Sequence, residues 1–295
     1  MRSGLNHVVD VDIKGYFDNI PHAPLMQLVK ERIADGKVLD LIEACLKQPV
    51  AEEGEKEEIP DKGSPQGGIK CQHWRSKSGW LSALRSGCPL LANIYLDPLD
   101  QLLAARGIQS VRYADDIVIL TTSAEAARQA LELVQGWMEG AQLTLHPDKT
   151  RIVDMGHNDS CFDFLGYRFQ RSKSGKLLRL IRPKSKQKLR ENLKPWTRRT
   201  NGKSLPAIIA IINPVLRGWG NYFQQAVRGE QVRMDQWVRM RLRSILRQRN
   251  HGKGRGQGLD HFKWPNRYFG KLGLHSLLEA RDQALMSLRK EGAKC

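Results

Sequence analysis

The chain has 295 residues, 40% of them hydrophobic, which is enough to bury a core and long enough for more than one domain. Lys and Arg outnumber Asp and Glu by 48 to 31, giving a formal net charge of +17 and a pI near 9.9. This excess argues against a disordered acidic tail and indicates a polyanionic partner, with nucleic acid ahead of anionic lipid or of mere basic solubility.

Cysteine usage and hydropathy indicate in which cellular compartment the protein is expected. The 5 cysteines are odd in number and form no CxxC pair, so they support neither a disulfide framework nor a zinc finger. No apolar run reaches the roughly eighteen residues of a membrane span, and the first residues do not resemble a signal peptide. We therefore expect a cytoplasmic protein with no membrane partner.

The first elements expected along the chain are a strand and a helix. Residues 7–13, HVVDVDI, form an apolar run that carries Asp10 and Asp12 and predicts a strand. A turn and a helix over residues 23–46 follow. The stretch 51–68 is acidic and then rich in Gly and Pro, which indicates a loop or short hairpin.

A helix and a hairpin come next. Residues 89–105 carry apolar side chains at helical spacing and predict a buried helix. Residues 111–120, VRYADDIVIL, place β-forming side chains on both sides of Asp115 and Asp116, residues that favour turns. We expect two short strands joined by a tight turn, with the acids at the tip.

The remaining elements of the first half complete a mixed pattern. Ser123 is placed to cap a helix that ends near Gly140. Residues 143–153 and 161–170 then predict one strand each. Strands, a hairpin and helices in this order predict an α+β domain with an antiparallel sheet.

Composition changes after Gln170. Residues 168–203 hold fourteen Lys or Arg and a single acid, Glu191. Helices are predicted over residues 205–226 and 231–249, separated from the last helical stretch by the basic loop HGKGRGQG. We expect one domain over residues 1–170 and a helical, basic domain over residues 171–295.

Three carboxylates have the character of a magnesium site. Asp12 ends a strand, and Asp115 and Asp116 occupy a hairpin tip that can lie beside it in one sheet. Mg²⁺ prefers one or two carboxylates completed by phosphates and water, and two ions about 3.5–4 Å apart suit nucleotidyl transfer. A solvated Asp-Asp turn is the plain alternative. Asp10 lies on the same strand face as Asp12 and is an alternative ligand.

Several phrases occur together in one order and resemble the palm motifs of reverse transcriptases. The last of them, FDFLGYRF, and the later phrase INPVLRGWGNYF, which matches the thumb or X region, resemble the bacterial group II intron branch specifically. The full set is VVDVDIKGYFDNIPH, GSPQGG, PLLANIYLDPLD, VRYADDIVIL, LTLHPDKT and FDFLGYRF.

The resemblance implies a reverse-transcriptase palm followed by an α-helical thumb or X (maturase) domain. The implied function is RNA-directed DNA polymerase with a role in binding and splicing intron RNA. Its expected partners are an RNA template, intron RNA, a DNA primer or target, and dNTPs. Two Mg²⁺ ions are the expected cofactors.

The family pattern also assigns roles to residues. It implies Asp12, the backbone carbonyl of Ile13 and Asp115 as metal ligands, with Asp116 as the third catalytic acid. Phe17 matches the bulky gate beneath the sugar, although Tyr16 beside it is a competing aromatic and a core position is the plain alternative. Ile13, Phe17 and Gln66 form the expected dNTP site.

Nucleic-acid contacts are implied at four further residues. Tyr113 would touch the primer end, and Lys149 matches a basic residue near the nucleic-acid backbone. Arg217 and Trp219 combine a cation with an aromatic ring that can stack on unpaired bases. Packing of Trp219 within a helix bundle is an equal alternative.

Two departures from the family pattern leave other functions open. Few residues precede the first strand, so we expect the fingers region to be missing, and residues 70–88 interrupt two motifs that are nearly contiguous in the family. This insertion suggests a rearranged gene copy or an inserted segment, or else a metal or RNA site that includes Cys71, His73 and Cys88. A catalytically defective, maturase-like RNA-binding remnant is therefore the second functional hypothesis. A retron-type or diversity-generating reverse transcriptase is the third.

Overall fold

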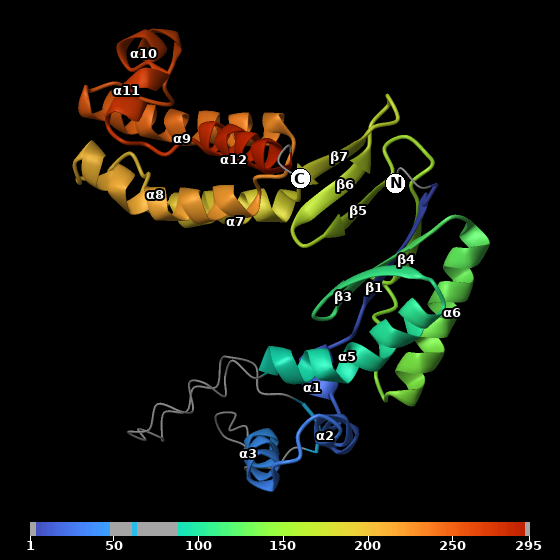
Figure 1. Cartoon of the computed structure of the whole chain (residues 1–295). Helices are drawn as coiled ribbons and strands as arrows, with labels where there is room; N and C mark the ends of the chain where they lie inside the picture. Colours follow the sequence, from blue (N-terminus) through green and yellow to red (C-terminus); the bar gives the residue numbers. More distant parts are fainter. Residues whose placement is uncertain (1–3, 48–60, 64–87, 293–295) are drawn as a thin grey trace. The chain divides into compact units, whose positions relative to one another are not determined.

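The computed structural model describes residues 4–47, 61–63 and 88–292 (Figure 1). The chain divides into two compact units, Met1–Ser160 and Cys161–Cys295. Gln66 and the insertion at residues 70–88 fall almost entirely outside the described residues. Among the described helices, none combines the length and the apolar character that a membrane span requires.

A four-stranded antiparallel sheet organises the first unit, in the order β2-β3-β1-β4. Its strands are β1 (His7–Asp12), β2 (Gln109–Tyr113), β3 (Asp116–Thr121) and β4 (Arg151–Asp154). The predicted first strand and the predicted hairpin are thus confirmed.

The first unit contains the described helices α1 (Tyr16–Asn19), α2 (His22–Lys30), α3 (Gly36–Leu46), α5 (Cys88–Ala105) and α6 (Ala124–Gly140). Of these, α5 and α6 pack against the sheet, whereas α2 packs against α5 and α3 packs against α2 (Figure 1). Val9 and Val11 of β1 are buried in one core together with Leu99 of α5 and Val134 of α6. Since side chains alternate along a strand, Asp10 and Asp12 belong to the opposite face.

Two helices replace the single one expected over residues 23–46. The chain leaves the helical conformation between Lys30 and Gly36, and Asp35 starts α3 by accepting hydrogen bonds from the backbone N–H groups of Lys37 and Val38. A carboxylate at an N-cap satisfies donors that the helix itself leaves unpaired, which favours a new start at this point. The predicted cap of α6 is confirmed, because Ser123 Oγ accepts from the backbone N–H of Ala126.

The second unit opens with a three-stranded antiparallel sheet, β5-β6-β7, made of β5 (Cys161–Phe164), β6 (Tyr167–Arg171) and β7 (Leu177–Ile181). The single strand expected over residues 161–170 is therefore a hairpin, whose turn holds Leu165 and Gly166 at positive φ. The predicted domain boundary after Gln170 falls inside β6, because the basic composition begins in these strands before any helix starts.

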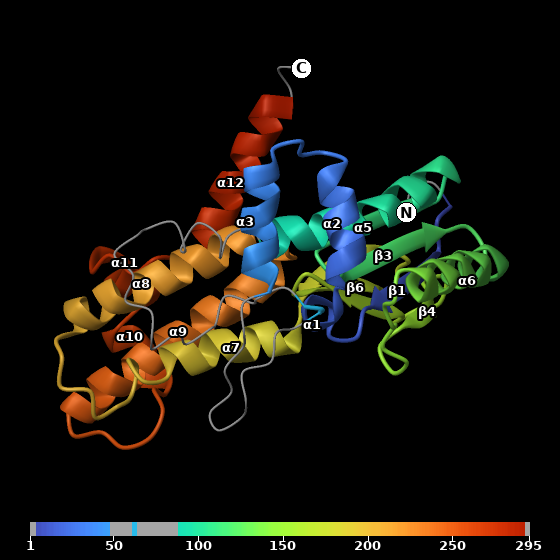
Figure 2. The same cartoon turned by 90° about the horizontal axis from the view of Figure 1, so that it is seen from below.

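Helices form the rest of the second unit (Figures 1 and 2). They are α7 (Pro183–Leu193), α8 (Leu205–Tyr222), α9 (Arg228–Arg249), α10 (Gly258–Lys263), α11 (Asn266–Lys271) and α12 (Leu277–Gly292). Leu216 of α8 and Leu242 of α9 are buried in one core with Phe269 and Leu277. Antiparallel sheets with packed helices, followed by a helical region, confirm the predicted α+β class.

Candidate active site

Two of the predicted catalytic acids lie on neighbouring strands. Asp12, the last residue of β1, is the direct cross-strand partner of Asp116, the first residue of β3. Asp116 also pairs with Tyr113 at the end of β2, and the Tyr113 side chain is 66% exposed. Asp115 lies in the turn between them, beside Ala114, whose φ of 54° is uncommon for a residue with a Cβ. Sheet register therefore places Asp12 beside the hairpin tip that carries Asp115 and Asp116.

Arg112 fixes this tip to α5, a role that the sequence analysis missed. Its Nε donates to Asp100 Oδ1 at 2.9 Å, and its Nη1 donates to Asn93 Oδ1 at 2.8 Å and to the Ala114 carbonyl at 3.1 Å. A planar guanidinium offers several donors in a fixed geometry, so one side chain can hold both a helix and the turn. The strand residue that precedes Tyr113 thereby orients the acids that follow it.

Cations from the chain itself face the acids of β1. Lys149 Nζ lies 3.0 Å from Asp12 Oδ2, and Arg151 Nε lies 3.4 Å from Asp10 Oδ2. The Lys149 side chain is 59% exposed, whereas that of Asp12 is 25% exposed. Lys149 was predicted to contact nucleic acid, yet in this structure it forms an ion pair with a predicted metal ligand.

Backbone hydrogen bonds bring Lys149 to Asp12. The N–H of His146 donates to the Asp12 carbonyl at 2.8 Å, and the N–H of Lys14 donates to the Thr144 carbonyl at 2.9 Å. Ile13 and Leu145 form an isolated bridge between the same two segments. The strand expected over residues 143–153 is thus reduced to this bridge and β4, which fixes the turn that carries Lys149.

The carboxylates of this face act on one another. Burial raises the pKa of Asp10, the Arg151 guanidinium opposes that rise, and the charges of Asp116 and Asp12 add to it. Like charges close together disfavour joint ionisation, so this face has reason to bind a cation. We refer to Asp10, Asp12 and Asp116 as the acidic face.

The two aromatic residues after β1 have different environments. Tyr16 is 1% exposed, its hydroxyl donates to the Ala92 carbonyl, and burial raises its pKa far above the ordinary value. Phe17 packs against the same core but is only partly buried. Of the two candidates for the sugar gate, Tyr16 is committed to the core, so Phe17 stays the better candidate.

The acidic face offers carboxylate oxygens, the donors that Mg²⁺ prefers, but too few of them for a complete coordination shell. Within the described ranges, no group of three or more His, Cys, Asp and Glu side chains is gathered tightly enough to hold a metal ion. Asp12 and Asp116 are a cross-strand pair, and the Lys149 ammonium already lies against Asp12. Two carboxylates of this kind suit an ion whose other ligands are phosphates and water.

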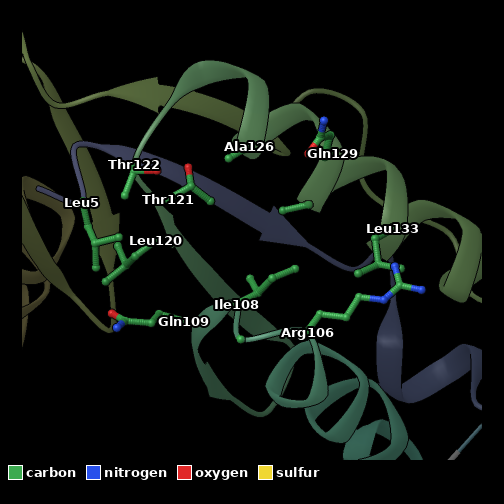
Figure 3. A pocket seen from close by; sticks show the side chains of 12 residues that line it. Leu5, Arg106, Ile108, Gln109, Leu120, Thr121, Thr122, Ala126, Gln129 and Leu133 are labelled. Atoms are coloured by element: carbon green, nitrogen blue, oxygen red, sulfur yellow. The ribbon is translucent and has the colours of Figure 1, made fainter.

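Two cavities of the first unit lie away from the acidic face. A cavity of about 430 Å³ lies at the far end of β2 and β3 from the hairpin tip, lined by residues that include Leu5, Gln109 and Leu120 (Figure 3). A second, of about 470 Å³, lies among α2, α5 and α6. None of the residues of the acidic face lines either cavity.

The predicted nucleic-acid residues of the second unit lie on α8 and differ in exposure. Arg217 is exposed. Trp219 is half-buried, its ring centroid lies 4.9 Å from that of Phe223, and its Nε1 is buried without a hydrogen-bond partner among the described residues. Tyr222, 55% exposed, donates its hydroxyl to the Leu165 carbonyl at 2.9 Å. These contacts favour the packing alternative for Trp219.

Two family models match the chain. Residues 83–169 match the reverse transcriptase (RNA-dependent DNA polymerase) model, and residues 186–264 match the group II intron maturase-specific domain. The first range contains the hairpin tip and Lys149. The second contains Arg217, Trp219 and all of α9.

Curated relatives agree with these matches. Protein YkfC from Escherichia coli is 28% identical over 202 residues, which cover 57% of this chain and 48% of that protein. The group II intron-encoded protein LtrA from Lactococcus lactis is 39% identical over 100 residues, which cover 34% of this chain and 14% of that protein. The chain thus spans at most about half the length of these relatives.

Solved structures add a weaker likeness. Telomerase from Candida Tropicalis, in a complex with a telomeric RNA fragment, aligns with a TM-score of 0.44 and 11% identity over 74% of this chain and 38% of that one. This overlap is too low to transfer any residue role. Since the reverse transcriptase and maturase-specific matches follow one another here in the order expected from the motifs, the chain belongs to the group II intron reverse transcriptase and maturase family.

Proposed function

We propose that the chain is an RNA-directed DNA polymerase that extends a primer by two-metal nucleotidyl transfer and also binds intron RNA. The observation that carries the proposal is the cross-strand pairing of Asp12 with Asp116, next to Asp115 in a turn that Arg112 holds. Its proposed partners are an RNA template, intron RNA, a DNA primer or target, and dNTPs.

Each acid has a proposed role. Asp12, the Ile13 carbonyl and Asp115 would hold the two Mg²⁺ ions, with Asp116 as the third acid. When bound, the ions would favour deprotonation of the primer 3′-hydroxyl and stabilise the charge of the leaving pyrophosphate. The exposed Tyr113, next to these acids in the sheet, would position the primer end.

Residues around the acids would select and retain the nucleotide. Phe17 would lie under the sugar, where its ring excludes a ribose 2′-hydroxyl, and Gln66, outside the described residues, would contact the nucleotide. Lys149 would release Asp12 as a metal ion arrives and would then be available to a phosphate. Arg217 would contact RNA from α8, where its side chain is exposed.

A binding protein that no longer polymerises is the second candidate. The excess of Lys and Arg over residues 168–203 favours it, because this basic segment lies outside the acidic face. In such a remnant the basic second unit would hold RNA through phosphate contacts, and the acidic face would have no catalytic role.

The test is primer extension on an RNA template with Mg²⁺ and dNTPs. We expect extension by the unaltered chain and a loss of about a hundredfold or more in the double variant Asp115→Asn, Asp116→Asn, because the metal ligands are removed. The matched control is Glu132→Gln, Glu139→Gln, which removes the same charge from exposed positions of α6.

The outcomes separate the two candidates. Extension lost in the Asp double variant but retained in the Glu control supports the polymerase. No extension by the unaltered chain, with salt-sensitive RNA binding intact, rejects the polymerase and supports the binding protein.

A further inference from the structure

The arginines near the C-terminal end of α9 include a set that anchors two neighbouring loops. Arg247 Nε donates to the Lys253 carbonyl at 2.8 Å, and its Nη1 lies 2.7 Å from Asp260 Oδ2. Arg249 Nη2 donates to the Asn201 carbonyl at 3.1 Å. The loops that follow α7 and α9 are therefore fixed against α9 by arginine side chains.

Glycines let the second of these loops approach α9. A Cβ at Gly252 would lie 2.6 Å from Arg247 Cγ, and a Cβ at Gly256 would lie 3.1 Å from Arg243 Cβ. Contacts this short exclude or strain any larger residue. The loop between them carries Arg255, so the position of this exposed arginine is set by the packing around it.

A second set of arginines surrounds Trp237 of α9. The guanidinium carbons of Arg190 and Arg241 each lie 5.9 Å from the centre of the Trp237 ring. Arg241 Nε donates to Thr197 Oγ1 at 3.2 Å, and Thr197, 1% exposed, donates in turn to the Leu193 carbonyl. The Arg241 side chain is thus oriented through Nε, while its two Nη groups form no ion pair with an acid of the described residues.

Positive charge accumulates around Arg241 without compensation. Burial lowers the pKa of Arg241, and the charges of Arg199 and Arg255, from the two anchored loops, lower it further. In the described part of the chain, no acid forms an ion pair with Arg190, Arg199, Arg241 or Arg255. Elsewhere in α9, by contrast, Arg239 faces Asp235 at 3.6 Å and Arg247 faces Asp260.

We propose that Arg190, Arg199, Arg241 and Arg255, the arginine cluster, form a binding site for successive backbone phosphates of RNA. Guanidinium groups match phosphate oxygens with paired hydrogen bonds, and a bound anion would relieve the repulsion among the four charges. The cluster joins four cations from α7, α9 and the two loops, which suits a chain with several phosphates better than a single anion.

The identity of the ligand as RNA rests on the proposed function, whereas the site itself rests on the contacts above. Binding by the full chain is measured with a structured RNA over a series of salt concentrations. The test variant is Arg199→Gln, Arg255→Gln, and the matched control is Lys173→Gln, Lys176→Gln, which removes the same charge from exposed positions next to β6 and β7.

We expect the test variant to lower RNA affinity about tenfold and to reduce the slope of log affinity against log salt by about two, because two phosphate contacts are lost. The control should change affinity less than about twofold. Equal losses in both variants would overturn the proposal, because net charge alone would then explain binding. Arg199 and Arg255 are exposed, and equal thermal unfolding of all three proteins excludes misfolding as the cause.

Arg241→Lys tests the geometry of the site, since it retains the charge but removes the planar fork and the contact with Thr197. We expect about a tenfold loss of RNA affinity, and unchanged affinity would contradict the site. Vesicles with anionic lipid provide a further arm: binding to vesicles that depends on Arg199 and Arg255, with RNA binding unchanged, would reject RNA as the ligand. None of these measurements needs primer extension, so they test the arginine cluster independently of the result of the polymerase assay.

Discussion

The acidic face of the first unit and the arginine cluster of the second differ in whether their charged side chains have partners of opposite charge within their own unit. Asp10 and Asp12 each face a cation of their own unit, Arg151 and Lys149. The four arginines of the cluster form no ion pair with an acid among the described residues. A paired site must exchange a partner in order to work, whereas an unpaired site is ready for an external one.

This difference has a physical basis in burial. The Asp12 side chain is 25% exposed, and a carboxylate at such a position is stabilised by a nearby cation until another cation replaces it. Arg190, Arg199 and Arg255 are exposed, so water can solvate their charges without an acid. The first region therefore suits binding by exchange, and the second suits direct attraction of a polyanion.

The largest effect that we expect is a loss of stability when a paired arginine of the second unit loses its acid. The pair is Arg239 with Asp235, in contrast to the arginine cluster, which has no acid partner among the described residues. Asp235, 4% exposed, accepts from the backbone N–H of Leu277 at 3.0 Å and from Ser276 Oγ at 2.9 Å, and it faces Arg239 at 3.6 Å. Asp235→Ala should lower the free energy of unfolding by about 3 kcal/mol, because buried donors and a guanidinium lose their partner.

Denaturant unfolding of the full chain measures this loss. The control is Asp282→Ala, whose side chain is 37% exposed and lies 2.9 Å from Arg281 Nη1, and for which we expect less than about 1 kcal/mol. Similar losses of unfolding free energy in both variants would contradict the view that the buried pair of Arg239 and Asp235 stabilises the second unit.

A smaller effect should follow from removal of the internal cation of the acidic face. In Lys149→Gln, Asp12 no longer has an ammonium 3.0 Å away, so a divalent ion has no competitor there. We expect the affinity of the full chain for Mn²⁺ to rise about fivefold, as appropriate to a half-exposed ion pair worth about 1 kcal/mol. Titration of free Mn²⁺ by electron paramagnetic resonance measures it without any polymerase activity.

The matched control removes an equal charge from another ion pair of the first unit. Lys47→Gln breaks the contact with Glu43 on α3, 2.6 Å in length, and should leave Mn²⁺ affinity unchanged. Unchanged or weaker Mn²⁺ binding in Lys149→Gln would show that Lys149 does not compete with the metal, which would remove the proposed exchange.

Local sequence signals predicted much of this arrangement. The apolar run of β1, the hairpin of β2 and β3 and the Ser123 cap each depend on signals within a few residues, and each was confirmed. The placement of Asp12, Asp115 and Asp116 at one end of the sheet depends on the register of β1 against β3. The sequence predicted only that these elements can lie side by side.

Contacts between distant residues were beyond the sequence. Lys149 and Asp12 are separated by 137 positions, and Arg112 and Asp100 by 12, so no local periodicity links either pair. The arginine cluster likewise draws on two helices and two loops. Its members looked like any other residues of a basic stretch until packing separated anchored side chains from unpaired ones.

The smallest effect that we expect is a pH dependence of stability that comes from His275, which lies near the Arg217 charge. Burial lowers the pKa of His275 below its ordinary value of 6.5, the Arg217 charge lowers it further, and Asp235 and Glu279 oppose that shift. The folded protein therefore binds this proton less readily than the unfolded chain. Stability should be complete above about pH 6.5 and should fall as the pH drops below it, by a small fraction of the one-proton limit of about 1.4 kcal/mol per pH unit.

Denaturant midpoints between about pH 7.5 and pH 5.5 measure this dependence. His275→Gln should flatten it, whereas the exposed control His261→Gln should not. An unchanged dependence in His275→Gln would assign the proton to another group. If Arg217→Gln flattens the curve in part, the positive charge of Arg217 on α8 acts on the core of its own unit as well as on an external anion, which would extend the comparison from binding to stability.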